Sequence, residues 1–474
     1  MATPNTHYGE KGIAQMLEGK NPCRMFFCGI GGINMSSLAR MTKSRGFSVC
    51  GSDRSLSPMT EALAAEGIPV FSPQCADNVK DVDLFVYTVA VSPDNPEYER
   101  AGALGIPRVS RADYLGYLMS GSRMRIGVCG THGKSTASAM CAGVFERGGK
   151  DPTVMCGADM SLPGGCLGAY RPGKEDVFIF EACEYMDSFL DFCPTVAVIL
   201  NLEMDHVDYF HSMEQLRASY AAFAEISVRN GGYVLYYGGD PEAARALGEI
   251  PADRKRTFGF SPSDDYCADA LADSHGCYRF TVCEKNGTAT RISLRVPGRH
   301  NVLNALAAFA AAREDGIAPD VAAAGLAAFG GIHRRMEYKG HLGRACVYDD
   351  YAHHPTEIRA SLTAARSMAG KGRLLCLFQS HTYSRTAALL PEMAAALRLA
   401  DEILVAPIYA ARETDTLGMD QYRMAEAVGK GARGCADLKE AAEQLIRLVQ
   451  DGDTVIVMGA GNVDGVFAML PLEK

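Results

Sequence analysis

The chain has 474 residues, which predicts about three domains at roughly 100–200 residues per domain. Apolar residues make up 47% of it, and 47 basic against 56 acidic side chains give a net charge of -9. Because nucleic acids and anionic membranes bind clustered Lys and Arg, this balance argues against both as the main partner. We also expect no membrane insertion, since no stretch approaches the roughly 20 apolar residues of a membrane span. We expect no signal peptide, because MATPNTHYGEKG lacks a charged segment followed by an apolar one.

The 16 cysteines show neither CxxC pairs nor zinc-finger spacing. Several of them, including Cys129 and Cys376, fall inside apolar stretches that read as strands. This usage favours a reduced, cytoplasmic chain in which Cys serves as a small hydrophobic residue.

The first block begins near Met25, where RMFFCGIGGINMSSLARM predicts a strand, a Gly-rich turn and a helix. The next two strands are predicted to end at Asp53 and near Val91. The turn GIGGIN is close to the dinucleotide fingerprint, but Asn34 replaces its last Gly. It indicates a diphosphate at a helix N-terminus rather than NAD in particular. The alternative is a tight turn that only closes strand onto helix.

The second block begins at Met124 and contains GTHGKST between an apolar strand and a helix. This is the context of a phosphate loop, in which Lys134 would neutralise the β- and γ-phosphates and the Ser135 hydroxyl would bind Mg²⁺. Val128 stands where the standard loop has its first Gly, so this is a variant of the pattern. The alternative is an ordinary Gly-rich turn that happens to carry a Lys.

Two further apolar strands are predicted to end at Glu181 and Asn201, and His206 follows the second. Carboxylates at this edge of a parallel sheet face the ligand crevice. We therefore predict that Ser135 holds one Mg²⁺ and that Glu181 and His206 hold a second, with Mn²⁺ as a substitute because imidazole is an unusual ligand for Mg²⁺. The alternative for His206 is a capping or packing role. From about 259 to 296, short alternating stretches predict a small antiparallel side element.

The third block starts near Gly330, and strands ACVYDD, RLLCLF, EILVAP and TVIVMGAG alternate with helical segments. Polar residues follow two of these strands, in DDYAHHPTEI and QSHTYSRT. They suggest a site, although Pro355 and Thr356 are equally suited to begin a helix beside solvated histidines.

The predicted fold is therefore α/β with three domains. A Rossmann-like N-terminal domain (1–120) is followed by a central P-loop ATPase-like domain with a small antiparallel side sheet (121–328). A Rossmann-like C-terminal domain (329–474) completes the chain. The linkers are expected near residues 118–124 and 326–332.

Eight segments follow one another along the chain: GIGGINMSSLA, GTHGKST, EACEYMDSFL, ILNLEMDHVDYF, PGRHNVLNALAA, HRRMEYKG, DDYAHHPTEI and FQSHTYSRT. Taken together, they resemble the Mur ligase family over essentially the whole chain. The resemblance implies a UDP-sugar-binding N-terminal domain, an ATP-binding central domain and an amino-acid-binding C-terminal domain. The resemblance implies ATP as cofactor, with Mg²⁺, and assigns ATP-binding roles to residues of three motifs: Gly130, Thr131, His132, Gly133, Lys134, Ser135, Thr136, His300, Asn301, Asn304, Arg334 and Arg335.

The same resemblance implies that Glu181 and His206 bind the second metal ion. It places four N-terminal residues near the UDP end of the nucleotide sugar: Gly29, Gly31, Gly32 and Asp53.

Three C-terminal residues match positions that line the amino-acid and muramyl carboxylate region: Tyr351, His353 and Arg385. The catalytic residues implied are Lys134, Arg335, His353 and Arg385, and the role of His353 would be to position the amine or help accept its proton.

The implied reaction joins L-alanine to the lactyl carboxylate of UDP-N-acetylmuramate through an acyl phosphate, with closure of the third domain to exclude water. Two departures from the family bear on this. Thr382 stands where many relatives have Arg, which leaves one substrate contact in doubt. No Lys lies between Val207 and Asn230, which fits the alanine-adding branch, because other branches use a carbamylated lysine there.

Three alternatives differ from this interpretation. A recycling ligase would attach a whole tripeptide to the same nucleotide sugar. The third domain must then distinguish this ligase from one that adds L-alanine. A nucleotide-sugar-binding regulator needs no metal pair, so Lys134, Ser135, Glu181 and His206 disfavour it. A nicotinamide oxidoreductase would leave GTHGKST without a role. The oligomeric state stays open.

Overall fold

The computed structural model describes residues 3–20, 23–157, 169–174, 176–206, 209–411 and 413–473. Val207 and Asp208, part of the quoted motif ILNLEMDHVDYF, lie outside the described residues. The chain divides into two compact units, one comprising Met1–Tyr266 with Ala307–Gly325 and the other Cys267–Leu306 with Leu326–Lys474.

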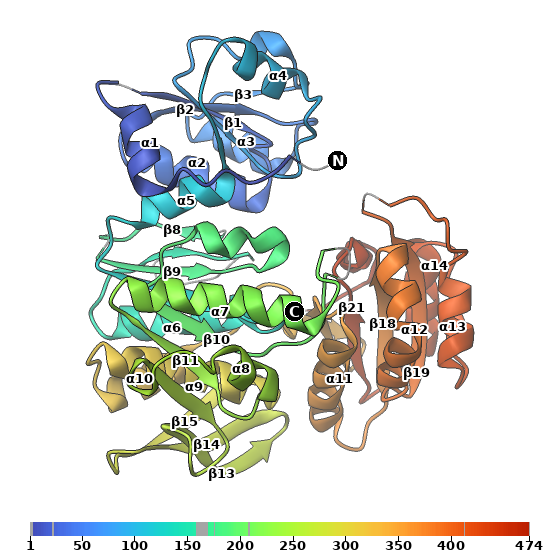
Figure 1. Ribbon diagram of the computed structural model, residues 1–474. Helices are drawn as coiled ribbons and strands as arrows, with labels where there is room; N and C mark the ends of the chain where they lie inside the picture. Colours follow the sequence, from blue (N-terminus) through green and yellow to red (C-terminus); the bar gives the residue numbers. More distant parts are fainter. Residues whose placement is uncertain are drawn as a thin grey trace. The chain divides into compact units, whose positions relative to one another are not determined.

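The first unit begins with a parallel sheet of order β3-β2-β1-β4-β5 (Figure 1). Its strands are β1 (Arg24–Cys28), β2 (Ser48–Ser52), β3 (Val70–Phe71), β4 (Leu84–Tyr87) and β5 (Arg108–Ser110). Its helices are α1 (Gly9–Leu17), α2 (Ile33–Ser44), α3 (Pro58–Ala65), α4 (Pro96–Ala103) and α5 (Arg111–Met119), with a 3-10 turn η1 (Ala76–Asn78). The order matches the doubly wound arrangement expected from the sequence.

Side-chain alternation along β1 explains why helices cover both faces of this sheet. Met25 and Phe27 are buried in a cluster that includes Leu38 of α2. Phe26 packs instead with Phe85 in a separate buried cluster. The predicted third strand is shorter than expected: β4 ends at Tyr87, because the chain turns at once and the Val91 amide donates to the Thr88 carbonyl.

The first unit also contains seven strands of a second sheet, in the order β12-β11-β10-β6-β9-β7-β8, and these are parallel except for the β7–β8 pair. The strands are β6 (Met124–Cys129), β7 (Thr153–Met155), β8 (Tyr170–Arg171), β9 (Val177–Glu181), β10 (Val196–Ile199), β11 (Tyr233–Tyr237) and β12 (Lys255–Gly259). The accompanying helices are α6 (Lys134–Arg147), α7 (Met213–Arg229) and α8 (Pro241–Ala246), with 3-10 turns η2 (Tyr185–Asp191) and η3 (Ala252–Arg254). β6 lies between β10 and β9 and runs parallel to both, so the carboxyl ends of these three strands lie side by side at one edge of the sheet.

The predicted antiparallel element is confirmed. Its strands are β13 (Tyr266–Ser274), β14 (Cys277–Glu284) and β15 (Ala289–Pro297), and β14 pairs with β15 antiparallel. Two helices follow, α9 (His300–Glu314) and α10 (Pro319–Ala328).

The second unit contains a sheet of order β16-β17-β21-β18-β19-β20, in which only the edge pair β16–β17 is antiparallel. Its strands are β16 (Glu337–Leu342), β17 (Ala345–Asp350), β18 (Leu374–His381), β19 (Glu402–Tyr409), β20 (Arg433–Gly434) and β21 (Thr454–Met458). Its helices are α11 (Pro355–Ala369), α12 (Tyr383–Leu397), α13 (Gln421–Val428) and α14 (Leu438–Leu448), with a final 3-10 turn η4 (Val463–Met469).

Alternation along β18 again separates two cores. Cys376 and Phe378 pack with residues of α11, α12 and α13, whereas Leu375 and Leu377 pack with α14 and η4. Helices thus cover both faces of this sheet, as the doubly wound pattern predicts.

The described cysteines are all unpaired, and Cys129 and Cys376 are buried within strands as expected. Among the described residues, none of the helices combines the length and apolar character that a membrane span needs.

One close contact joins the first sheet's last helix to η2. A Cβ added at Gly116 of α5 would lie 2.2 Å from the carbonyl oxygen of Asp191. An Ala in a helix interior usually stabilises by up to about 1 kcal/mol over Gly, but overpacking costs about 1–3 kcal/mol.

We therefore predict that Gly116→Ala lowers the thermal unfolding midpoint. Gly143→Ala in α6 is the matched control, since a Cβ there meets no atom within 4 Å, and its midpoint should stay equal or rise. A Gly116→Ala protein as stable as the wild type in differential scanning fluorimetry would contradict this close packing.

Candidate functional site

The loop between β6 and α6 is shaped by two glycines with positive φ. Gly130 has φ 134° and Gly133 has φ 86°, and a Cβ at Gly130 would lie 3.0 Å from the Asn201 amide nitrogen. Gly133 caps α6 without any side chain bonding to the first helical amides. Those amides form the positive end of the helix dipole, which favours an anion.

Lys134, the first residue of α6, is turned back over this loop. Its Nζ donates to the Gly130 carbonyl at 2.7 Å and to the Thr131 carbonyl at 3.3 Å, and it pairs with the Glu184 carboxylate at 3.1 Å. Burial alone would lower the pKa of Lys134, but the charge of Glu184, with smaller help from Glu181, outweighs it and holds the pKa above its usual value. The lysine is therefore a fixed positive charge.

Ser135 and Glu181, predicted as metal ligands from different segments, do lie together. The Ser135 hydroxyl donates to Glu181 Oε2 at 2.7 Å, and the Gly157 amide donates to the same oxygen at 2.8 Å. Glu181 is the last residue of β9, so the sheet edge positions its carboxylate beside the start of α6. A hydroxyl and a carboxylate are oxygen ligands of the kind that Mg²⁺ prefers.

His206 adopts a positive φ of 51°, and its amide donates to Asp205 Oδ1 at 2.7 Å. Its ring lies 4.7 Å, centre to centre, from that of Tyr185. Within the described part of the chain, no hydrogen bond or ion pair joins His206 to Ser135 or Glu181. Its role as a second-metal ligand stays a prediction.

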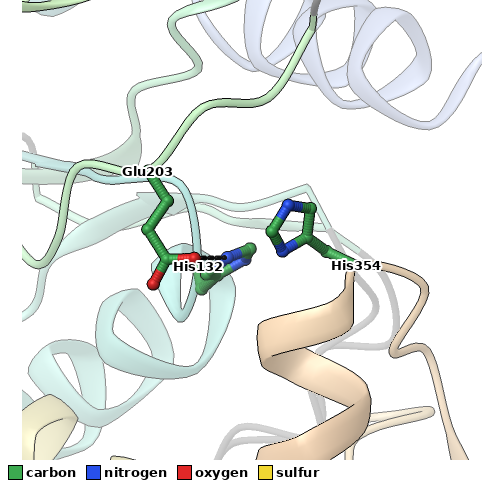
Figure 2. Close-up of side chains that lie close together, drawn as sticks. All are labelled: His132, Glu203 and His354. Atoms are coloured by element: carbon green, nitrogen blue, oxygen red, sulfur yellow. Dashed lines mark ion pairs between the residues drawn. The ribbon is translucent and has the colours of Figure 1, made fainter. Parts of the chain in front are cut away.

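The segment after β10 holds the phosphate loop from the other side. The His132 amide donates to Asn201 Oδ1 at 2.8 Å, and Asn201 Nδ2 donates back to the His132 carbonyl at 3.0 Å. The Thr131 hydroxyl donates to the Glu203 carbonyl at 3.0 Å, and His132 Nε2 lies 3.5 Å from the Glu203 carboxylate (Figure 2). These contacts tie the backbone of the loop to the chain segment that follows β10.

The Gly-rich turn of the first sheet is closed by Asp53. The Gly31 amide donates to Asp53 Oδ2 at 2.8 Å, and a Cβ at Gly31 would lie 2.7 Å from the same oxygen. The Gly32 amide donates to the Gly29 carbonyl at 3.2 Å, and α2 begins without a side-chain cap. The α2 N-terminus is therefore the part of this turn best suited to receive a diphosphate.

In the second unit, Arg334 is bound by its own C-terminal sheet. Its guanidinium donates to the Gly459 carbonyl at 2.6 Å and to the Gly461 carbonyl at 3.0 Å, and it lies 5.1 Å from the Tyr351 ring centre. Arg335 lies 5.3 Å from the same ring and 3.8 Å from Glu357.

The predicted amino-acid region gathers around β17 and β18. His353 Nδ1 lies 3.0 Å from the Tyr351 carbonyl, and the His353 ring is 6.0 Å from that of His381. Arg385 Nη1 lies 3.5 Å from His381 Nδ1. The structure thus connects His353 and Arg385 through His381, which lies in the quoted motif but was given no role from the sequence.

Pro355 begins α11, as the helix-start alternative proposed, and buried His354 caps it by accepting from the Thr356 amide (Figure 2). The solvated histidines of that alternative are not observed. Asn301 Nδ2 donates to the Pro297 carbonyl at 2.7 Å, and Asn304 Nδ2 donates to Asn301 Oδ1 at 2.9 Å, near the start of α9 where His300 also lies.

Comparison with known proteins identifies three consecutive family domains. Residues 25–123 match the Mur ligase family catalytic domain, 128–312 the Mur ligase middle domain, and 334–461 the Mur ligase glutamate ligase domain.

One curated relative is the UDP-N-acetylmuramate–L-alanine ligase of Lachnospira eligens, 39% identical over 94% of this chain and 97% of that protein. The crystal structure of UDP-N-acetylmuramate-alanine ligase MurC from Thermotoga maritima has a TM-score of 0.79 and 30% identity, covering 94% of this chain and 97% of that one. A murein peptide ligase from Psychrobacter arcticus shares the fold, with a TM-score of 0.68 and 22% identity over 94% and 98% of the two chains. The three-domain α/β fold predicted from the sequence is confirmed.

Asp349, at the end of β17, is fully buried, and neither of its carboxylate oxygens has a hydrogen-bond partner among the described residues. Burial raises its pKa to about 6, although Arg334, 3.6 Å away, opposes the rise. The folded pKa lies above the unfolded value of about 3.9. The contribution of the Asp349 carboxyl to the free energy of unfolding is therefore fully present below about pH 4. It is lost as the pH rises through about 6, which lowers the free energy of unfolding by up to roughly 3 kcal/mol.

We predict that Asp349→Asn has a higher thermal midpoint than the wild type at pH 8 and that this difference shrinks towards pH 4. The exposed Asp451, replaced by Asn, is the control and should show no such trend. An Asp349→Asn difference that is independent of pH would contradict a raised carboxyl pKa.

Proposed function

The chain belongs to the Mur ligase family, and on that premise we propose that it is an ATP-dependent ligase joining L-alanine to the lactyl carboxylate of UDP-N-acetylmuramate. The activity is a step of peptidoglycan precursor synthesis. The observation that carries the proposal is the phosphate loop, in which the uncapped start of α6, the fixed charge of Lys134 and the Ser135–Glu181 pair converge.

The reaction requires activation because a carboxylate has no good leaving group. In the proposed sequence, the lactyl carboxylate oxygen attacks the γ-phosphorus of ATP, and the bond to the β,γ-bridging oxygen breaks to release ADP. The L-alanine amine then attacks the carbonyl carbon of the acyl phosphate. Phosphate leaves, a proton leaves the nitrogen, and the amide remains.

Lys134 and the first amides of α6 are suited to bind the β- and γ-phosphates, since both present positive charge along one short loop. Lys134 would also balance the charge that develops on the transferred phosphoryl group. Phosphate binding would also involve Thr131, His132 and Thr136. Asn201 and Glu203 hold the loop that carries Thr131 and His132 in place.

The donor set fits Mg²⁺. Ser135 and Glu181 already share a 2.7 Å contact, and the loop for the phosphates is beside them. Bound there, Mg²⁺ would supply Lewis-acid stabilisation of phosphate charge. Glu181 with His206 stays our proposal for a second ion, for which Mn²⁺ is the better match to an imidazole ligand.

We assign the UDP diphosphate to the N-terminus of α2 next to Gly29, Gly31 and Gly32. In this assignment Asp53 supports the turn, since its carboxylate accepts the Gly31 amide. We assign the adenine of ATP to the segment of the second unit that carries His300, Asn301 and Asn304.

The L-alanine region is proposed around Tyr351, His353 and Arg385. A neutral His353 that donates Nδ1–H to the Tyr351 carbonyl would carry its basic lone pair on Nε2, the nitrogen suited to take the amine proton. Arg385 would bind a carboxylate, and Arg335 would face phosphate charge. Arg334 would support its neighbour, since two carbonyls of the C-terminal sheet hold its guanidinium.

The proposal is tested by phosphate release with ATP, Mg²⁺ and UDP-N-acetylmuramate. We expect L-alanine to stimulate release and a cell-wall tripeptide to have little effect. Lys134→Ala should lower the L-alanine-dependent rate by about 100- to 1,000-fold, because one preorganised donor at a transition state contributes roughly 2.7–4 kcal/mol.

Unchanged circular dichroism of the Lys134→Ala protein would exclude unfolding as the cause. Stimulation by the tripeptide but not by L-alanine would favour the recycling activity of the murein peptide ligases. Near-normal turnover of Lys134→Ala would contradict the phosphate-loop assignment.

The metal assignment makes a separate prediction. Glu181→Gln keeps the hydrogen-bond geometry but removes the charge, so the Mg²⁺ concentration for half-maximal rate should rise by about 10-fold or more. Glu242→Gln, an acid of α8 that pairs with Arg217, is the control and should leave the metal dependence unchanged. An unchanged metal requirement in Glu181→Gln would remove Glu181 from the ligand set.

A further inference from the structure

We propose that Glu184 is a positioning residue that holds the Lys134 ammonium over the phosphate loop, and so sets its alignment with the transferred phosphate. The inference rests on the proposed function and adds a residue that neither the sequence motifs nor the metal assignment required. Glu184 lies three residues beyond Glu181, at the start of η2.

The contact geometry accounts for every proton of the ammonium group. Lys134 has three N–H donors, and its acceptors are the Gly130 carbonyl, the Thr131 carbonyl and the Glu184 carboxylate, whose two oxygens lie 3.1 and 3.3 Å away. The Glu184 side chain is only 2% exposed, and that of Lys134 is 13% exposed. This is a largely desolvated ion pair, in which removal of one partner leaves a buried charge.

The segment that carries Glu184 is fixed from several directions. Two non-Gly residues just beyond it, Met186 and Asp187, have left-handed φ values of 54° and 53°. The Asp187 carboxylate accepts hydroxyls from Tyr209, at 2.6 Å, and from Ser219. Such backbone conformations cost of order 1–3 kcal/mol each and persist only where the surroundings determine them.

The N-terminal segment adds a further constraint. Asn5 Nδ2 donates to the Met186 carbonyl at 3.3 Å, and α5 packs so closely on the Asp191 carbonyl that Gly116 has no room for a side chain. The carboxylate of Glu184 is therefore positioned by the fold of the whole first unit.

The three acceptors differ in what an arriving triphosphate can replace. Phosphate oxygens compete well for the two N–H groups now given to neutral carbonyls, whereas the buried carboxylate retains the third. Lys134 would then pivot about Glu184 towards the β- and γ-phosphates. A negative charge beside a triphosphate does not improve ATP binding, so the benefit must appear in the alignment of Lys134 during phosphoryl transfer.

The test separates kcat from nucleotide affinity. For Glu184→Gln, we expect the Kd of a non-hydrolysable ATP analogue, measured by calorimetry, to stay within about threefold or become tighter. The kcat should fall by about 10- to 100-fold, since misplacement by about 1 Å can cost that much. Glu184→Asp retains the charge at a shorter reach and should recover part of the rate.

The matched control is Glu146→Gln. Glu146 also pairs with a cation, Arg171 at 2.6 Å, from the far end of α6, and its variant should keep the wild-type kcat. The inference is overturned if kcat of Glu184→Gln stays within about twofold of the wild type, or if kcat and analogue binding fall together and Glu184→Asp restores neither. Wild-type protein that binds no ATP analogue would instead overturn the proposed function.

Discussion

The structure depends on a single strand-to-helix turn, in which two left-handed glycines expose the positive end of α6 and place a largely buried lysine beside it. Uncompensated, that concentration of positive charge would be costly to bury. Glu184 and the loop carbonyls compensate it in this structure, and a triphosphate would replace part of that compensation. The surrounding contacts can be understood as ways of keeping this turn in one shape.

The neighbouring strands make those contacts. Glu181, at the end of β9, accepts a hydrogen bond from Ser135, and Asn201 and Glu203, which follow β10, bind residues of the loop. Because parallel strands end at one edge, three segments distant in sequence meet there without special bending. The first sheet participates through α5 and the N-terminal segment, which fix η2. The packing of the first unit therefore bears directly on the geometry of its phosphate loop.

The sequence was sufficient for the elements with strong periodicity and for motifs whose chemistry is local. The sequence predicts β6, β9, β17 and the antiparallel strands. It also predicts Ser135 at a helix start and Glu181 at a strand end, but not the direct contact between them, since it assigns them to different metal ions. Contacts set by tertiary packing were not foreseen. Glu184 lies in EACEYMDSFL, but its ion pair with Lys134 joins residues 50 positions apart, which no local pattern predicts. Arg334 binds carbonyls more than 120 residues away, and His206 adopts a backbone conformation that no pattern predicts. The roles assigned to individual site residues, and the domain limits, stay predictions.

The most direct measurement is a crystal structure with a non-hydrolysable ATP analogue, Mg²⁺ and UDP-N-acetylmuramate. The account predicts that the β- and γ-phosphates contact the amides at the start of α6 and the Lys134 ammonium, with Glu184 still bound to that ammonium. A nucleotide bound elsewhere, or phosphates held without Lys134, would contradict it.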